Sequence, residues 1–201
     1  DAKFPAKYQK AIFLNDWTYG TMYAIHLVPD GASYRAEKEE FVSGVPLPLT
    51  DVIVRPQDGA MYFLVGGRKG QSALYKVSYI GQESTEPTIH PQMNAPAHQR
   101  VMLESLHKAG TPPSSITTAW PYLSHEDRFI RHAARVAIEK QPYALWAEKA
   151  LSSKDNLTTI ESMIALARVG GSSYQTAILN KLLDIDTTEL NKQQLLGLLR
   201  A

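Results

Sequence analysis

The sequence contains no cysteine among its 201 residues. That absence excludes disulfide bonds, thiolate zinc sites, iron–sulfur clusters and covalently attached haem c from this chain. Long hydrophobic runs are also missing, since no apolar stretch approaches the roughly 20 residues that span a bilayer. Neither sign of charge is in excess, because 21 basic residues stand against 20 acidic ones and the net charge is +1. Composition therefore gives no electrostatic case for binding nucleic acid or an anionic membrane.

The composition that remains is that of an ordinary globular protein, with 44% hydrophobic and 20% charged residues. A chain of 201 residues accommodates one or two domains. It opens on Asp1 rather than on methionine and carries no recognisable signal peptide. We therefore expect a mature or cut N-terminus, and a segment of a longer protein.

Strand signals dominate the first 80 residues. Six short segments are rich in β-branched and aromatic residues and are bounded by Gly, Pro and Asp: 11–15, 21–27, 34–42, 51–54, 60–65 and 73–79. They fall into two sets of three, and a three-stranded meander of this size is not stable alone. We interpret them as the last three strands of one β-propeller blade and the first three of the next. Because strand direction alternates, the longer loops at 16–20, 44–50 and 66–71 are predicted to share one face.

Composition changes abruptly after residue 80. Residues 81–96 are polar, contain three prolines and show neither strand nor helix period, so they are expected to form a linker. From residue 97 onward, apolar residues recur at helical spacing in segments at 97–108, 115–123, 127–140, 143–151, 157–169, 174–183 and 190–200. The longer helices are predicted to end near residues 140, 169 and 200. That interval of about 30 residues is typical of stacked helix pairs.

The predicted fold is thus a multidomain β + α protein. A partial β-propeller, made of its last one or two blades of antiparallel strands, occupies residues 1–80. A linker covers residues 81–96, and an α-solenoid of HEAT-like helical repeats covers residues 97–201. Tetratricopeptide repeats are the alternative for the helices, although their Gly and Tyr pattern is missing.

The longer loops carry the candidate binding residues. The aromatic residues at 17 and 19 either stack on a sugar or cofactor ring or pack between blades. The aspartates at 16 and 51 either act as ligands or general bases, or accept hydrogen bonds from nearby amides. The basic pair at 68 and 69 either helps a glycine-rich loop to bind an anion or carries two solvated charges. The predicted rim of the site comprises Asp16, Trp17, Tyr19, Thr50, Asp51, Arg68 and Lys69.

A second candidate surface lies on the helix predicted at 127–140. One side of this helix carries Arg128, Arg131, His132 and Arg135. The stripe either docks an acidic protein partner, stacks against neighbouring repeats, or is a solvated helix face. The six histidines form no ligand set, and no Gly-x-Ser-x-Gly nucleophile elbow is present. We therefore predict no catalytic residue and no metal ligand in this chain.

Several phrases of the sequence resemble one protein family. Residues 4–20 read FPAKYQKAIFLNDWTYG, residues 23–27 read YAIHL, and residues 127–137 read DRFIRHAARVA. They are similar to the closing blades of glucose/sorbosone dehydrogenase-like β-propellers, and to the HEAT-like repeats that follow them, in the membrane-bound dehydrogenases of planctomycete-type bacteria. The resemblance covers nearly the whole chain, and the order of the parts is the same.

The resemblance implies an exported, periplasmic bacterial sugar or alcohol dehydrogenase, an oxidoreductase linked to a quinone or haem. In that family the complete propeller binds pyrroloquinoline quinone (PQQ) and calcium, the catalytic histidine lies in an upstream blade, and haem c lies in a downstream domain. This chain would then supply one rim of the site and a scaffold toward the haem domain, with the remaining blades as its partner. The basic residues expected to hold the quinone are replaced by residues such as Trp17, Thr18 and Pro48. A non-catalytic scaffold that binds a glycan or a protein is therefore the alternative.

Overall fold

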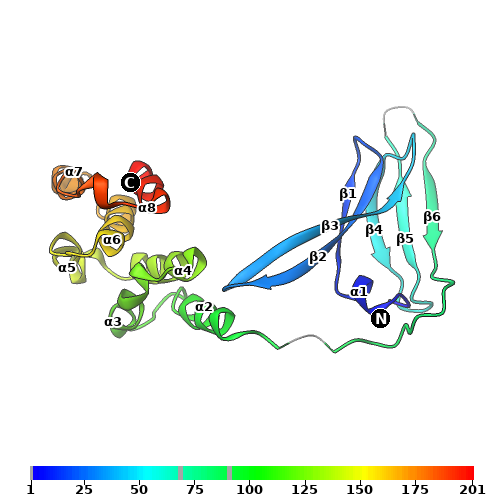
Figure 1. Cartoon of the computed structure of the whole chain (residues 1–201), viewed down its shortest axis with the longest axis horizontal. Helices are drawn as coiled ribbons and strands as arrows, with labels where there is room; N and C mark the ends of the chain where they lie inside the picture. Colours follow the sequence, from blue (N-terminus) through cyan, green and yellow to red (C-terminus); the bar gives the residue numbers. More distant parts are fainter. Residues whose placement is uncertain (1, 68–69, 90–91) are drawn as a thin grey trace. The chain divides into compact units, whose positions relative to one another are not determined.

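The computed structural model describes residues 2–67, 70–89 and 92–201. The chain divides into two compact units (Figure 1). Each unit has its own hydrophobic core. The first, here called the sheet unit, comprises Asp1–Asp30 and Tyr34–Gln92. The second, here called the helical unit, comprises Gly31–Ser33 and Met93–Ala201.

The sheet unit contains two three-stranded sheets, with strand orders β1-β2-β3 and β4-β5-β6. Within each sheet, strands that are consecutive in sequence pair with one another, and the pairs β1–β2, β4–β5 and β5–β6 are antiparallel. The elements are the short helix α1 (Ala6–Gln9) and the strands β1 (Ile12–Asp16), β2 (Thr21–Asp30), β3 (Ser33–Ser43), β4 (Leu49–Val54), β5 (Met61–Val65) and β6 (Ala73–Val77). Neighbouring strands joined by short turns give local pairing, which is why the sequence pattern locates them well.

Alternation along the strands builds the core of this unit. On β5, Met61, Phe63 and Val65 are buried, while Tyr62 and Leu64 point to the opposite face. This is the period of two that a pleated strand imposes on its side chains. The buried apolar cluster comprises Phe4, Met22, Leu49, Met61, Phe63 and Val65.

Asp58 stabilises the tight turn between β4 and β5. Its Oδ2 accepts a hydrogen bond from the Tyr62 hydroxyl at 2.7 Å and lies 3.1 Å from Lys76 Nζ. Its Oδ1 accepts the Ala60 N–H at 3.2 Å. These contacts, the Tyr62 hydrogen bond above all, hold the pKa of Asp58 well below its ordinary value. One carboxylate thus ties the turn to β5 and β6.

The side chain of Gln9 binds a segment that the sequence places in the linker. Its Nε2 donates to the carbonyl oxygens of Thr85 at 3.3 Å and Glu86 at 3.0 Å. Its Oε1 accepts the N–H of Thr88 at 3.1 Å. Backbone groups need partners when they leave water, and this amide supplies three of them. Residues 85–88 therefore lie against the start of the sheet unit.

The helical unit consists of short helices joined by 3₁₀ turns. Its α-helices are α2 (Ala95–Ser105), α3 (Ser114–Ala119), α4 (Arg128–Glu139), α5 (Ala147–Leu151), α6 (Asn156–Val169), α7 (Gln175–Leu183) and α8 (Lys192–Arg200). Short polar side chains begin several of them: Asp127 Oδ1 accepts the Phe129 N–H at 2.8 Å, and Asp155 Oδ1 accepts the Thr158 N–H at 2.7 Å. Trp146 lies in the core, where its Nε1 donates to the carbonyl oxygen of Gln141 at 3.3 Å.

The predicted partial β-propeller is wrong. The six strands lie close to the predicted segments, but the described residues form two three-stranded sheets and no propeller blade. A blade has four strands arranged around a central channel. Local hydrophobic alternation reports only that a segment is a strand with one buried face. This alternation carries no information about a fourth strand or about a ring of blades, which is why the propeller prediction was wrong.

The predicted α-solenoid of HEAT-like repeats is wrong as well. The described helices of this unit range from the five residues of α5 to the 14 of α6, and α2, α4, α6 and α8 begin at residues 95, 128, 156 and 192. These lengths and starting points define no evident repeating unit. The buried apolar side chains form one continuous cluster that contains Ala32 and residues from Leu103 to Leu182. Helical periodicity identifies the buried face of each helix, but it does not specify which neighbour covers that face.

Candidate functional site

A pocket of about 730 Å³ opens in the sheet unit. It is lined by residues 17–20, by residues 44–48, by Gly67, Gly70 and Gln71, and by strand residues that include Tyr75. We call it the aromatic pocket. The three longer loops, which the sequence groups on one face, therefore meet at one site.

Glycines bring the loops of the aromatic pocket together. Gly20 has a φ of 65°, in the left-handed region that favours glycine, and a Cβ at this position would overlap the carbonyl oxygen of Gly44. The N–H of Gly44 donates to the carbonyl oxygen of Gly20 at 3.0 Å. On the other side, the Nε1 of Trp17 donates to the carbonyl oxygen of Gly66 at 3.1 Å. The indole is thus fixed between loops that are far apart in sequence.

Exposed aromatic and proline side chains form much of the pocket wall. The Tyr19 side chain is 76% exposed, and Tyr75 is 45% exposed. The Tyr75 ring stacks on Phe63, with ring centroids 5.0 Å apart and an interplanar angle of 15°. Pro46, which follows a cis peptide bond, and Pro48 also line the pocket. These rings present flat apolar faces to any ligand that enters.

No described residue that lines the aromatic pocket carries a charge. Asp16 begins the first loop, but its Oδ1 accepts the N–H groups of Thr18 and Tyr19, each at 3.0 Å. The structure therefore agrees with the second alternative for Asp16, in which its carboxylate accepts hydrogen bonds from nearby backbone amides. Thr18, Gln71 and backbone groups supply the polar part of the wall.

Thr50 and Asp51 do not line the aromatic pocket. Thr50 Oγ1 donates to the carbonyl oxygen of Leu64 at 3.2 Å, and Asp51 Oδ1 accepts the Val52 N–H at 2.8 Å. Asp51 borders a separate hollow of about 100 Å³. Arg68 and Lys69 lie outside the described residues. Of the five predicted rim residues that the structure describes, Trp17 and Tyr19 line the aromatic pocket.

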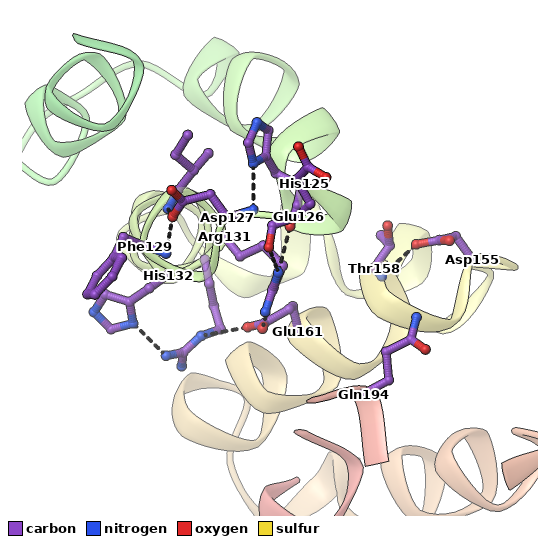
Figure 2. A network of polar contacts seen from close by, with 12 residues as sticks. His125, Glu126, Asp127, Phe129, Arg131, His132, Asp155, Thr158, Glu161 and Gln194 are labelled. Atoms are coloured by element: carbon purple, nitrogen blue, oxygen red, sulfur yellow. Dashed lines mark hydrogen bonds and ion pairs between the residues drawn. The ribbon is translucent and has the colours of Figure 1, made fainter. Parts of the chain in front are cut away.

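A second concavity, of about 370 Å³, lies in the helical unit between α4, α6 and α8. All four residues of the predicted stripe line it: Arg128, Arg131, His132 and Arg135. We call it the arginine groove. Figure 2 shows Arg131, His132 and Glu161 within one polar network.

Two arginines of the groove are held by glutamates from the same unit. Arg131, which is 7% exposed, donates from Nη1 to the carbonyl oxygens of His125 at 2.6 Å and Glu126 at 2.9 Å, and its Nε lies 3.4 Å from Glu161 Oε1. Arg135 Nε lies 3.2 Å from Glu161 Oε2. A buried arginine requires such partners, because an unpaired buried charge is costly. Part of the stripe is therefore structural.

His132 is neutral within this network. Arg135 Nη2 donates to His132 Nδ1 at 2.9 Å, so this ring nitrogen accepts the hydrogen bond. Burial and the neighbouring Arg135 charge lower the pKa of His132 below its ordinary value of 6.5. The imidazole therefore adds no positive charge to the groove at neutral pH.

Sequence analysis missed several lining residues because they come from distant segments. Tyr75 lies on β6 and joins the aromatic pocket through strand pairing, in which it opposes Phe63. Glu161 lies on α6 and Arg200 on α8, both outside the helix that carries the stripe. A helical-face plot of each element alone does not contain this information.

The fit of the implied cofactors can be tested on the pocket lining. PQQ carries several carboxylates and would need cationic partners, which no described residue of the aromatic pocket supplies. Calcium takes oxygen ligands, mainly carboxylates and carbonyls, and the nearby Asp16 carboxylate is already bound to two amides. The described lining therefore offers no cationic side chain for PQQ and no carboxylate for calcium. Elsewhere in the described parts of the chain, no cluster of three or more His, Asp or Glu side chains is arranged to hold a metal ion.

The chain matches no protein-family model, and comparisons with curated proteins and with solved structures find no match. Within residues 2–67, 70–89 and 92–201, no helix has the length and apolar character needed to cross a membrane.

Proposed function

We propose that the sheet unit is a binding module whose aromatic pocket takes a neutral, hydroxylated ring compound such as a sugar residue of a glycan. The proposal rests on the combination of exposed aromatic rings with an uncharged described lining. The apolar C–H face of a sugar ring stacks on aromatic rings, while its hydroxyl groups bind polar side chains and backbone groups.

The geometry of the aromatic pocket supports binding without large rearrangement. Its volume of about 730 Å³ lies in the usual range for small-molecule sites. The Trp17 indole is held by its hydrogen bond to the Gly66 carbonyl oxygen, and Tyr75 is held by its stacking on Phe63. Rings that are fixed before binding cost less conformational entropy when a ligand stacks on them.

The test is a titration of the whole chain with neutral oligosaccharides of glucose, mannose, xylose and N-acetylglucosamine. Binding is followed by the NMR signal of the Trp17 indole N–H, together with isothermal calorimetry. We expect at least one neutral glycan to shift the Trp17 signal. Tyr19→Ala is expected to lower its affinity about tenfold, a loss of about 1.4 kcal/mol.

The matched control is Tyr34→Ala, since Tyr34 is an exposed tyrosine, 49% accessible, on β3 and away from the pocket. It should leave glycan affinity unchanged. The proposal would be overturned if Tyr19→Ala left the glycan affinity unchanged. It would also be overturned if the pocket bound only charged sugars or proline-rich peptides. The dehydrogenase activity implied by the sequence resemblance stays a prediction, and dye-linked sugar oxidation by the full-length protein tests it.

A further inference from the structure

The arginine groove combines an excess of positive charge with an apolar floor. Four arginines line it, at positions 128, 131, 135 and 200, and Glu161 is the one carboxylate among the described lining residues. His132 is neutral, as its hydrogen bond from Arg135 requires. Glu139, which does not line the groove, pairs with Arg135 at 2.9 Å and with Arg168 at 3.0 Å. The glutamates of this region therefore leave the arginines in excess.

Two of the four arginines are available to a partner. Arg128 is exposed, and its guanidinium lies 4.6 Å from the ring centroid of Phe129. This cation–π contact orients the side chain, and Arg128 forms no ion pair with an acidic side chain among the described residues. Arg200 is exposed near the end of α8. Arg131 and Arg135, in contrast, hold Glu161 and fix the wall of the groove. The groove thus has a rigid interior and a cationic rim.

The apolar floor is formed where α6 meets α8. Ile160 is fully buried, and Gly197 allows α8 to approach it closely, since a Cβ at 197 would lie 3.1 Å from Ile160 Cγ2. Leu196, which is 57% exposed, and Ile164 extend the apolar surface along the groove. Exposed leucine beside unpaired arginine is a surface that an apolar and acidic ligand would cover.

We propose that the arginine groove docks an acidic peptide segment of a partner protein, with leucine-like side chains on the apolar floor and carboxylates against Arg128 and Arg200. Charge complementarity argues for this occupant. Carboxylates satisfy exposed guanidinium groups, and the apolar floor adds burial that a free anion would lack. The proposal is independent of the glycan site, because every residue it uses belongs to the helical unit.

The experiment uses the full chain and a fluorescein-labelled peptide of glutamate and leucine residues, followed by fluorescence polarisation. The wild-type chain is expected to bind this peptide, more weakly as salt is added, and to bind its glutamine-for-glutamate analogue at least tenfold more weakly. The double variant Arg128→Glu/Arg200→Glu should lose at least tenfold in affinity. Lys108→Glu, which reverses the charge of an exposed lysine outside the groove, should lose much less.

A second readout locates the site and keeps the test independent of folding. The methyl signals of Ile164 and Leu196 should shift on peptide addition, while thermal unfolding shows that the double variant remains folded. The proposal is overturned if the wild-type chain does not bind the peptide, or if the glutamine analogue binds equally well. It is also overturned if the double variant binds as the wild type does, or if an oligonucleotide occupies the groove more tightly than the peptide.

Discussion

The sheet unit and the helical unit differ in the number of apolar side chains that form their cores. Among the described residues, the core cluster of the sheet unit contains six buried side chains, whereas that of the helical unit contains eighteen. Each buried side chain of the smaller core therefore carries a larger share of its stability. The comparison teaches that the sheet unit depends more on individual residues and on polar contacts around its turns, such as those of Asp58 and Gln9.

The two units also differ in where they place charge. In the sheet unit, ion pairs lie on partly exposed surfaces, as at Glu39 and Asp58, and the described lining of the candidate pocket is uncharged. In the helical unit, Arg131, Arg135 and Glu161 form a poorly exposed network beside the candidate groove. The described lining of the aromatic pocket is thus uncharged, whereas that of the arginine groove is cationic. A neutral ligand is therefore proposed for the pocket and an acidic one for the groove.

The largest expected effect follows from removing the indole at the centre of the helical core. Trp146 is 1% exposed, so Trp146→Ala should lower the free energy of unfolding of this unit by about 4 kcal/mol through lost contacts and a cavity. Urea unfolding followed by far-UV circular dichroism measures the change. Leu145→Ala, at a neighbour that is 54% exposed, is the control and should cost well under about 1 kcal/mol. Equal costs at the two positions would contradict the assigned core.

The same contrast can be made on one strand of the sheet unit. Phe63 is 3% exposed and stacks on Tyr75, while Leu64, the next residue, is 45% exposed on the opposite face. Phe63→Ala should cost about 3 kcal/mol, and Leu64→Ala well under about 1 kcal/mol. Loss of amide-exchange protection in β5 and β6 is the measurement. Because the two cores share no residue, helical signals should stay native, and their loss would break the comparison.

Within the arginine stripe, a structural and an exposed arginine should respond differently. Arg131→Ala leaves the carbonyl oxygens of His125 and Glu126 without their cationic donor, and leaves Glu161 with Arg135 alone, at a cost of about 3 kcal/mol. Arg128→Ala removes an exposed side chain and should change the free energy of unfolding by less than about 0.5 kcal/mol. Thermal unfolding of both variants tests this. If Arg128→Ala were the more harmful, the division of the stripe would be wrong.

The smallest effect is expected at the partly exposed Glu39. Its carboxylate accepts a hydrogen bond from the Tyr8 hydroxyl at 2.8 Å and lies 2.7 Å from His26 Nε2 and 3.2 Å from Lys7 Nζ. The Tyr8 hydrogen bond, followed by that of His26, lowers the pKa of Glu39 from 4.5 to about 2. Because the pKa in the folded state is the lower one, this stabilisation is complete above pH 4.5 and is lost as the pH falls toward 2.

Glu39→Gln should therefore destabilise the sheet unit by about 1 kcal/mol at pH 7, a figure kept small because solvent screens the contact. The difference between variant and wild type should shrink between pH 4.5 and 2. Urea unfolding across this pH range is the measurement. Glu37→Gln, at an exposed glutamate two residues away, is the control and should change the free energy of unfolding at pH 7 by less than about 0.5 kcal/mol. A difference that grows toward low pH would reverse the assigned sign.

Much of the secondary structure follows from local patterns. The strand from Met61 to Val65 shows a period of two in its burial, and Asp127 and Asp155 are of the residue types that begin helices. The grouping of the three longer loops on one face also follows from alternating strand direction. The predicted propeller and solenoid failed because both depend on which elements become neighbours, and no local pattern encodes that.

The candidate sites divide in the same way. Trp17 and Tyr19 can be selected from sequence because aromatic residues in a loop between strands are conspicuous. Tyr75 enters the aromatic pocket through its pairing with Phe63, and Arg200 enters the arginine groove because Gly197 lets α8 approach Ile160. Such residues come together only in the folded chain.

By itself, the sequence determined the strands, most of the helices, the near-zero net charge and the absence of thiol chemistry, since these depend on residue type and short-range periodicity. Only the tertiary structure decided that the strands form two small sheets, that the Trp17 indole binds the carbonyl oxygen of Gly66, and that Arg131 belongs to the protein interior. The physical reason is that burial and hydrogen-bond partners depend on contacts between distant segments. Those contacts exist only once the cores have formed.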